Sequence, residues 1–189
     1  MPDSTFPTAL ADSPVTRSYW VIEDRFLAGA YPGTADAAGS RKRVEELWDA
    51  GMRTFINLVE EDETNLTGQP FHPHENVLAE LGQQTGEVGT HLRFPVVDLS
   101  IPTVEQMRYI LDAIDHSLAQ EKPVYLHCFG GVGRTGTAVC CWLIRHGYAT
   151  KDEVFTTLSR LRRTDAIAGK RPAPERESQF QFIRDWPEP

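Results

Sequence analysis

The chain has 189 residues, of which 40% are hydrophobic and 24% are charged, a composition typical of a globular protein large enough to bury a substantial core. Its formal net charge of −8 argues against nucleic acid or an anionic membrane as the main partner. It does not exclude an anionic substrate, because a local site on an acidic protein can still be positive.

The N-terminal segment and the cysteine content bear on domain organisation and location. No apolar run approaches the ~20 residues of a membrane span, and the first residues lack the basic start and apolar stretch of a signal peptide. The chain contains 3 cysteines, which fits a reducing compartment better than a disulfide framework. We expect a cytoplasmic protein with a flexible N-terminal arm over residues 1–17 and a single domain over 18–186.

Strands and helices are expected to alternate in the first half of the chain. The segment after residue 39 is predicted to be a helix, with Ser40 as its N-cap and Gly51 just past its end. The expected elements are, in order, strands near 19–22 and 25–28, a helix over 40–50, a strand over 53–60, a helix within about 60–90 and a strand over 91–98.

The second half continues this alternation. Thr103 and Gln106 match a capping box at the start of a helix, and Thr150 and Glu153 match another. The expected elements are a helix over 103–120, a buried strand over 123–126, and helices over 134–147, 150–163 and 173–186, the last with Pro174 in its first turn. The pattern predicts an α/β fold with a central, mostly parallel sheet of four to five strands flanked by helices.

The stretch VYLHCFGGVGRTG places a cysteine between a strand and a helix. A strand that leads through a glycine-rich loop into a helix gathers backbone N–H groups and the helix dipole around one point, which binds anions. The loop lacks the Lys-Ser/Thr ending of a nucleotide-binding loop. Beside Arg134 and these amides, Cys128 is expected to be a thiolate, and the same groups could bind the oxygens of a phosphoryl group. The site therefore favours attack of sulfur on phosphorus.

The segment HCFGGVGRTG resembles the H-C-x-x-G-x-x-R-T-G signature of cysteine-dependent protein tyrosine and dual-specificity phosphatases, and the short chain is most similar to the small dual-specificity members. The resemblance implies that Cys128 forms a phosphocysteine and that Arg134 clamps the phosphoryl oxygens. It also implies that Thr135 hydrogen-bonds the sulfur and helps it leave, and that His127 orients the loop through hydrogen bonds. Backbone amides that bind the substrate are expected from Phe129, Gly130, Gly131, Val132 and Gly133.

The resemblance also implies an aspartic acid upstream that protonates the leaving group. Asp98, in FPVVDLSIPT, stands at the predicted end of a strand and is our choice. Asp112 and Asp115 are alternatives by distance, but both should lie in the middle of a helix and face solvent. The segment PERESQ is similar to a C-terminal element of some members, in which case Gln179 would position the hydrolytic water. The alternative is that Gln179 is an ordinary polar residue on an end helix.

The other polar residues that stand out can be explained by packing or solvation, without a catalytic or binding role. Cys140 and Cys141 fit core packing better than a redox role, although a disulfide with Cys128 is an alternative. The histidines His72 and His74 lack a third metal ligand in the sequence. The acidic run 60–63 is expected to be a solvated surface, with repulsion of acidic substrates as the alternative. The basic residues Arg160, Arg162, Arg163, Lys170 and Arg171 are expected to form a solvated helix surface, or else to flank the pocket and favour acidic phosphopeptides.

The function that these observations favour is a phosphatase of phosphotyrosine or dual specificity. The resemblance implies that members favouring phosphoinositides tend to carry Lys inside the loop, whereas the variable positions are uncharged here, which weakly disfavours phosphoinositides. Inositol phosphates and phosphoinositides are the alternative substrates. A catalytically weak phospho-binding module is a second alternative. A rhodanese fits less well because its sulfur loop is shorter than the five residues between Cys128 and Arg134. An arsenate reductase fits less well because its Cys loop lies near the N-terminus, ahead of the acid. We expect no cofactor or metal, a phosphorylated protein or peptide as partner, phosphate, sulfate or vanadate as pocket ligands, and neither nucleic acid nor membrane as partner.

Overall fold

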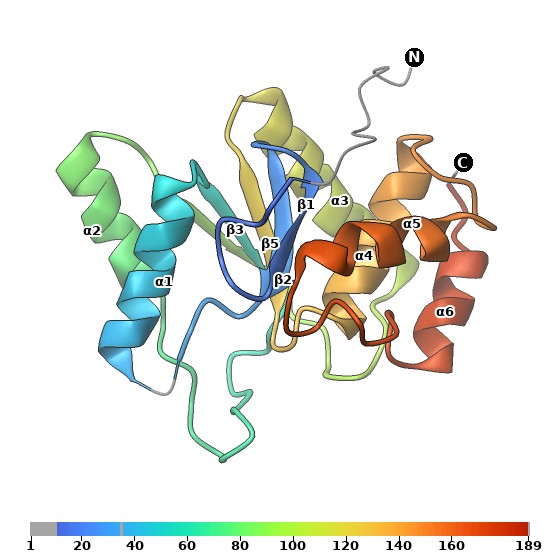
Figure 1. The fold of residues 1–189 in the computed structure, drawn as a ribbon, viewed down its shortest axis with the longest axis horizontal. Helices are drawn as coiled ribbons and strands as arrows, with labels where there is room; N and C mark the ends of the chain where they lie inside the picture. Colours follow the sequence, from blue (N-terminus) through green and yellow to red (C-terminus); the bar gives the residue numbers. More distant parts are fainter. Residues whose placement is uncertain (1–10, 35, 189) are drawn as a thin grey trace.

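The protein is built around one five-stranded sheet with the strand order β1-β2-β5-β3-β4 (Figure 1). The computed structural model describes residues 11–34 and 36–188. Strand β1 is antiparallel to β2, and the remaining neighbours are parallel, which confirms the predicted mostly parallel sheet. The strands are β1 (Ser18–Ile22), β2 (Phe26–Ala30), β3 (Thr54–Asn57), β4 (Thr90–Arg93) and β5 (Val124–Cys128).

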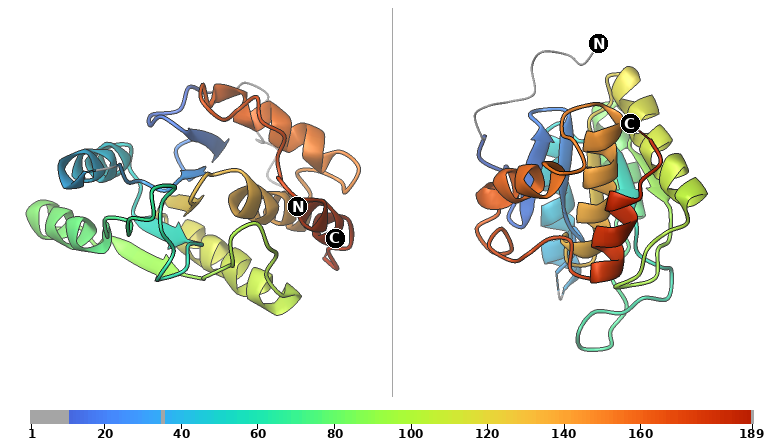
Figure 2. Two further views of the ribbon diagram at one scale, coloured as in Figure 1. Left: turned by 90° about the horizontal axis from the view of Figure 1, so that it is seen from below. Right: turned by 90° about the vertical axis from the view of Figure 1, so that its right-hand side faces the viewer.

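Helices cover both faces of this sheet, as Figures 1 and 2 show. One face carries α1 (Ala37–Asp49) and α2 (Glu75–Thr85), and the other carries α3 (Val104–Ala119) and α4 (Gly133–Arg145). The chain then continues through α5 (Val154–Leu161), a 3₁₀ turn (Arg162–Thr164) and α6 (Glu177–Arg184). None of the helices within the described ranges is long and apolar enough to cross a membrane. The cytoplasmic location stays a prediction.

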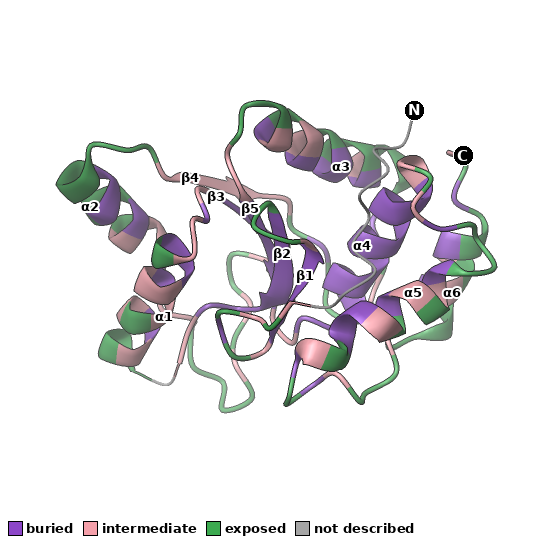
Figure 3. Cartoon of the chain, turned by 45° about the horizontal axis from the view of Figure 1, so that its top comes forward, coloured by how far each residue is buried: buried purple, intermediate pink, exposed green. Residues whose placement is uncertain are grey.

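The two faces of the sheet bury different side chains, because successive residues of a strand point to opposite sides. Ile56 and Leu126 belong to the core under α3 and α4, whereas their neighbours Phe55 and Tyr125 belong to the core under α1 and α2. Helix α4 is buried almost from end to end, as its purple colour in Figure 3 shows. The loop that follows Cys128 therefore lies between a central strand and a helix that is buried almost throughout.

Helix α1 begins earlier than the sequence predicted. Asp36, not Ser40, is the N-cap, and its carboxylate accepts a hydrogen bond of 2.8 Å from the backbone of Gly39. Ser40 lies one turn into the helix, where its hydroxyl donates to the carbonyl oxygen of Asp36 at 2.9 Å. Both residue types can cap a helix, and the first of them along the chain does so here.

Strand β4 ends at Arg93 instead of continuing to the predicted end at Asp98. Backbone hydrogen bonds toward β3 continue past this point, from Phe94 N to the Asn57 carbonyl oxygen at 2.9 Å and from Val96 N to the Leu58 carbonyl oxygen at 3.0 Å. The chain then turns where Ser100 N donates to the carbonyl oxygen of Val97 at 3.0 Å. Leu99 adopts a left-handed conformation with φ of 59°, which costs a residue with a side chain about 1–3 kcal/mol. Residues 94–103 thus form a loop, which we call the acid loop because it carries Asp98.

The last helix begins later than predicted. Pro174 precedes α6 and is not part of its first turn, since α6 starts at Glu177. The side chain of Gln179 accepts hydrogen bonds from the backbone N–H groups of Glu175 and Arg176 at 3.0 and 3.2 Å. A side chain in the first turn of α6 therefore accepts hydrogen bonds from two amides just ahead of the helix, which have no carbonyl partner within it.

The predicted N-terminal arm lies partly outside the described residues, because residues 1–10 are not described. Near its end, Val15 is 3% exposed in the core under α1 and α2, and Trp20 Nε1 donates to the carbonyl oxygen of Asp12. The flexible arm over 1–17 and the single domain over 18–186 stay predictions.

Candidate active site

Cys128 is the last residue of β5, which lies between β2 and β3 in the middle of the sheet. Its side chain is buried, and the loop from Phe129 to Val132 joins it to the start of α4. Gly131 has φ of 72°, and a Cβ there would lie 2.5 Å from the carbonyl carbon of Gly29. A glycine is needed at 131 because the loop passes this close to the end of β2.

The guanidinium of Arg134 is the positive group of the site, and the residue is 3% exposed. Nη1 donates to Oε2 of Glu63 at 2.6 Å and to the carbonyl oxygen of Val96 at 3.0 Å. Nη2 donates to Oε1 of Glu63 at 2.8 Å and lies 2.8 Å from Oδ1 of Asp98. Burial opposes the charged form, but the hydrogen bonds and negative charge of Glu63, together with Cys128 and Asp98, outweigh it and raise the pKa of Arg134.

Glu63 is the site residue that the sequence reasoning missed. The expectation of a solvated acidic run over 60–63 is wrong for this position, because the Glu63 side chain is 11% exposed and forms the bidentate pair with Arg134. A run of acidic residues directly after a central strand was the available signal, since such loops gather at the carboxyl edge of the sheet. Glu61 keeps the exposed position that the whole run was expected to have.

Asp98 lies on the acid loop at the same edge of the sheet as Cys128 and Arg134. Its side chain is 50% exposed, so it is the solvent-facing partner of Arg134, whereas Glu63 is the buried one. The structure thus brings together Cys128, Arg134 and the predicted acid. The alternative acids face elsewhere: Asp112 pairs with Arg145 at 2.7 Å on the outer side of α3.

Asp115 does not simply face solvent, as had been expected. Its carboxylate accepts hydrogen bonds of 2.8 Å from Trp142 Nε1 and 2.8 Å from His146 Nε2, and Arg145 lies 3.3 Å away. Burial alone would raise the pKa of Asp115, but the hydrogen bonds from His146 and Trp142 outweigh it and lower the pKa. Asp115 therefore joins α3 to α4.

Gln179 is fully buried, so the alternative of an ordinary polar residue on an end helix does not hold. Its Nε2 donates to the carbonyl oxygen of Ser100 at 3.1 Å. A Cβ on Gly133 would lie 3.0 Å from the same Nε2. Gln179 therefore lies between the start of α4 and the acid loop, and it holds the loop two residues beyond Asp98.

His127 and Thr135 flank the Cys loop but make other contacts than expected. Neither ring nitrogen of His127 makes a hydrogen bond of normal geometry with a described residue. Burial lowers the pKa of His127, and the backbone of Cys128 opposes this only in part. The expected role of this ring in orienting the loop stays a prediction. The hydroxyl of Thr135 donates to the carbonyl oxygen of Gly29 at 3.4 Å.

Aromatic rings enclose His127 instead of hydrogen-bond partners. The ring centroids of Tyr31, His74 and Tyr125 lie 5.3, 5.1 and 5.5 Å from that of His127. Burial holds the pKa of His127 well below its ordinary value of 6.5, and burial together with His91 lowers the pKa of His74 to about 3. Both rings are therefore neutral at physiological pH, and His127 is a packed core residue next to the thiol.

The remaining predicted groups are structural. All the cysteines are free, and burial raises the pKa of the Cys140 and Cys141 thiols, which keeps them protonated in the core. Arg162 is not on a solvated surface, because it is 1% exposed and donates to the carbonyl oxygens of Arg171 and Ala168 at 2.6 and 2.7 Å. Within residues 11–34 and 36–188, no cluster of His, Cys, Asp or Glu has an arrangement that could hold a metal ion.

Comparisons of the sequence with known proteins show which family and relatives it is similar to. A family model described as "Polymorphic toxin system, DSP-PTPase phosphatase" matches residues 30–148. The chain is 28% identical over 142 residues to phosphatidylglycerophosphate phosphatase PTPMT2 of Arabidopsis thaliana, covering 75% of this chain and 54% of that protein. It is 47% identical over 51 residues to the uncharacterized protein MJ0215 of Methanocaldococcus jannaschii, covering 27% and 32%. The chain thus spans about half or less of the length of these relatives.

The fold is shared with solved phosphatase structures. The crystal structure of Tk-PTP in the active form superposes with a TM-score of 0.64 at 22% identity, covering 90% of this chain and 95% of that chain. The five-stranded, mostly parallel sheet flanked by helices agrees with this likeness. Both the family that the sequence resembled and the predicted fold class are confirmed.

We predict that Glu63→Gln lowers the free energy of unfolding by about 2 kcal/mol, whereas Glu61→Gln changes it by less than about 0.5 kcal/mol. The amide offers one acceptor where the guanidinium of Arg134 needs two, so a buried charge loses half of its bidentate partner. Urea unfolding at pH 7 measures both variants. Equal stability of the two would show that Glu63 is only part of a solvated acidic surface.

We predict that stability falls with pH below about 6.5 because His74 and His127 are neutral in the folded protein and take up protons once it unfolds. Each such ring contributes stability that is complete above the unfolded pKa and is lost by about 1.4 kcal/mol per pH unit as the pH falls toward the folded pKa. Urea unfolding between pH 7 and pH 5 gives this slope. His74→Phe should reduce it and the exposed-site control His116→Gln should not; a flat profile would contradict the prediction.

Proposed function

The chain belongs to the DSP-PTPase phosphatase family of polymorphic toxin systems, and we propose that it hydrolyses phosphate monoesters through a covalent phosphocysteine. The observation that carries the proposal is the arrangement at the carboxyl edge of the sheet. There Cys128 precedes the start of α4, and a buried Arg134 is held by Glu63 while it also binds Asp98. A sulfur nucleophile, a fixed cation and a solvent-facing carboxylic acid are the groups that this reaction needs.

Substrate binding replaces one bond of Arg134. Both N–H groups of Nη1 are engaged by Glu63 and Val96, and one N–H of Nη2 is engaged by Glu63. The half-exposed Asp98 forms an ion pair of 2.8 Å with the same Nη2. A phosphoryl dianion takes over this contact with Nη2, together with loop amides of residues 129–133, and the carboxyl group of Asp98 moves from the guanidinium to the bridging ester oxygen. Glu63 keeps the guanidinium in place during the exchange.

The first chemical step transfers the phosphoryl group to sulfur. The Cys128 thiolate attacks phosphorus, the S–P bond forms, and the bond between phosphorus and the ester oxygen breaks. After it leaves Arg134, Asp98 takes up a proton from solvent and gives it to the departing oxygen, so the alcohol or phenol leaves neutral. Arg134 and the start of α4 offset the charge on the transferred oxygens.

The second step returns the enzyme to its starting state. Asp98, now a carboxylate, accepts a proton from a water that attacks phosphorus, the P–S bond breaks and inorganic phosphate leaves. Thr135 stabilises the departing thiolate when its hydroxyl turns from the Gly29 carbonyl oxygen toward sulfur. Gln179 acts as a positioning residue, since its bond to the Ser100 carbonyl oxygen supports the loop that carries Asp98.

The proposed substrate is a protein phosphorylated on tyrosine, or on tyrosine as well as on serine or threonine. Three exposed apolar side chains surround Asp98 on the acid loop: Val97, Leu99 and Ile101 are 58%, 40% and 39% exposed. Such a rim suits a leaving group with an apolar surface, such as a tyrosyl ring, better than a polyhydroxylated inositol ring. The similarity to PTPMT2, whose name states a lipid phosphate, favours a phospholipid monoester as the second candidate.

We predict that Cys128→Ser abolishes hydrolysis of p-nitrophenyl phosphate and that Asp98→Ala lowers kcat by about 10²-fold or more. The loss in Asp98→Ala should be larger on phosphotyrosine, because tyrosine is the more basic leaving group and depends more on protonation. Asp112→Ala, which changes the alternative acid, should leave kcat unchanged. Turnover by Cys128→Ser would overturn the phosphocysteine, and an unchanged kcat in Asp98→Ala would overturn the assignment of the acid.

A substrate panel separates the two candidate substrate classes. We predict a higher kcat/KM for a phosphotyrosine peptide than for phosphatidylglycerophosphate in detergent micelles or for an inositol phosphate. Phosphoserine and phosphothreonine versions of the same peptide decide between tyrosine-only and dual specificity. A lipid or inositol phosphate that is cleaved best would overturn the protein substrate and leave the reaction itself in place.

A further inference from the structure

Arg17 lies beside the Cys loop, although more than a hundred residues of sequence separate them. Its Nη2 donates to the carbonyl oxygen of Gly130 at 3.4 Å, and no other described residue accepts a hydrogen bond from this side chain. The Arg17 carbonyl oxygen accepts from the backbone N–H of Ala30 at 3.0 Å, and Ala30 pairs with Cys128 in the sheet. The end of β2 therefore places this guanidinium next to the loop that follows the thiol.

Two features of Arg17 cost free energy. Its φ of 65° is left-handed, a conformation that is unfavourable for a residue with a Cβ. Its Nε is buried without a partner among the described residues, and a buried N–H that makes no hydrogen bond is destabilising. Backbone strain of this kind persists where the surrounding structure requires it, and it is concentrated at functional sites. The contact of Arg17 with the Cys loop is the feature that such a cost would serve.

The peptide that links Gly130 to Gly131 is otherwise little restricted. A Cβ on Gly130 would meet no atom within 4 Å, and glycine adopts backbone angles that other residues avoid. The peptide is trans, so the carbonyl group of Gly130 and the N–H of Gly131 point in opposite directions. The bond to Arg17 therefore directs the N–H of Gly131 away from the guanidinium. No described residue accepts from this N–H, which leaves it free for a substrate.

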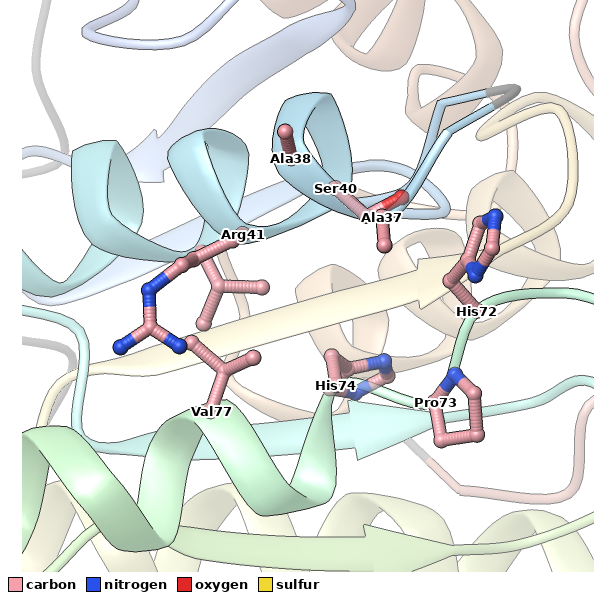
Figure 4. A pocket seen from close by; sticks show the side chains of 9 residues that line it. Ala37, Ala38, Ser40, Arg41, His72, Pro73, His74 and Val77 are labelled. Atoms are coloured by element: carbon pink, nitrogen blue, oxygen red, sulfur yellow. The ribbon is translucent and has the colours of Figure 1, made fainter.

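The preceding peptide of the loop is held in a different way. The backbone N–H of Tyr31 donates to the carbonyl oxygen of Phe129 at 3.1 Å. The ring of Tyr31 packs in turn against that of His74, which Figure 4 shows at the start of α2, at a centroid distance of 5.3 Å. The end of β2 and the rings behind it thus fix the Phe129 carbonyl group, whereas a single side chain holds the next one.

We propose that Arg17 is a positioning residue of the phosphatase reaction. By holding the carbonyl group of Gly130, it keeps the N–H of Gly131 turned into the pocket, where this N–H donates to a phosphoryl oxygen. Arg17 itself does not touch the substrate. The inference rests on the proposed function for its effect on turnover, but the binding of inorganic phosphate tests the orientation of the loop without any chemical step.

Arg17→Met removes the donor and keeps the aliphatic part of the side chain. We expect kcat/KM for p-nitrophenyl phosphate, and the affinity for inorganic phosphate, to fall by about 10-fold, the equivalent of one hydrogen bond to a charged oxygen. The loss should appear in KM more than in kcat, because the N–H of Gly131 binds the phosphoryl group before the transfer as well as during it. Arg17→Lys should restore part of both values, since an ammonium can still donate to the Gly130 carbonyl oxygen.

Arg43→Met is the matched control. Arg43 donates to the carbonyl oxygen of Thr16 at 3.0 Å, so it contacts the same segment of the chain without reaching the Cys loop. This variant loses the same charge and should keep the kcat/KM and the phosphate affinity of the parent protein. Arg17→Gly, which relieves the left-handed backbone, replaces Arg17→Met if the latter does not fold.

The amide resonance of Gly131 reports the orientation of the loop directly. Inorganic phosphate should move its ¹H resonance downfield in the parent protein, as expected when an N–H donates to an anion, and should not do so in Arg17→Met. A parent protein that binds phosphate but hydrolyses nothing would count against the proposed reaction, and the Gly131 resonance would still decide whether Arg17 orients the loop.

The proposal would be overturned by equal kcat/KM and equal phosphate affinity in Arg17→Met and Arg43→Met. A downfield movement of the Gly131 resonance that survives the loss of Arg17 would overturn it as well. A lower urea midpoint of Arg17→Met with unchanged phosphate binding would show that Arg17 only stabilises the fold.

Discussion

The guanidinium of Arg134 is almost completely buried, and a buried cation must be surrounded by acceptors to be tolerated. Its acceptors come from distant parts of the chain: Glu63 after β3, and Val96 and Asp98 after β4. One side chain thus joins the loops that follow neighbouring strands at the carboxyl edge of the sheet. The requirement to satisfy this cation, more than any local propensity, fixes where the acid loop lies relative to Cys128.

The groups next to the thiol follow a different rule. Behind Cys128, the rings of His127, His74, Tyr31 and Tyr125 form an aromatic layer in which imidazoles are kept neutral by burial. In front of it, the loop is nearly free of side chains and opens toward Arg134. The sulfur therefore lies between an apolar wall and a polar cradle, and only the cradle side can stabilise charge.

The sequence allowed the sheet, the Cys loop and Asp98 to be predicted because each has a local signature: an apolar run, a glycine-rich turn, a carboxylate near a strand end. Glu63 was expected to be solvated and Gln179 to position a water, since their actual contacts depend on partners far away in the chain, Arg134 and Ser100. The burial of Arg162 was not predicted either, although its partners Ala168 and Arg171 are close in the chain. Glu63 looks like any residue of an acidic run until Arg134 is placed beside it. The starts of α1 and α6 differed for a related reason, because the side chains of Asp36 and Gln179 decide them through individual hydrogen bonds.

Arg134 has a consequence for selectivity in the resting enzyme. Two carboxylates and a carbonyl oxygen already satisfy its terminal nitrogens, so the empty pocket presents no bare cation to the surrounding electrolyte. Under the proposed reaction, a phosphate ester has to displace Asp98 from the guanidinium, and a dianion gains more from this exchange than a singly charged ion does. The same carboxyl group would then make the site selective for dianions over monovalent anions.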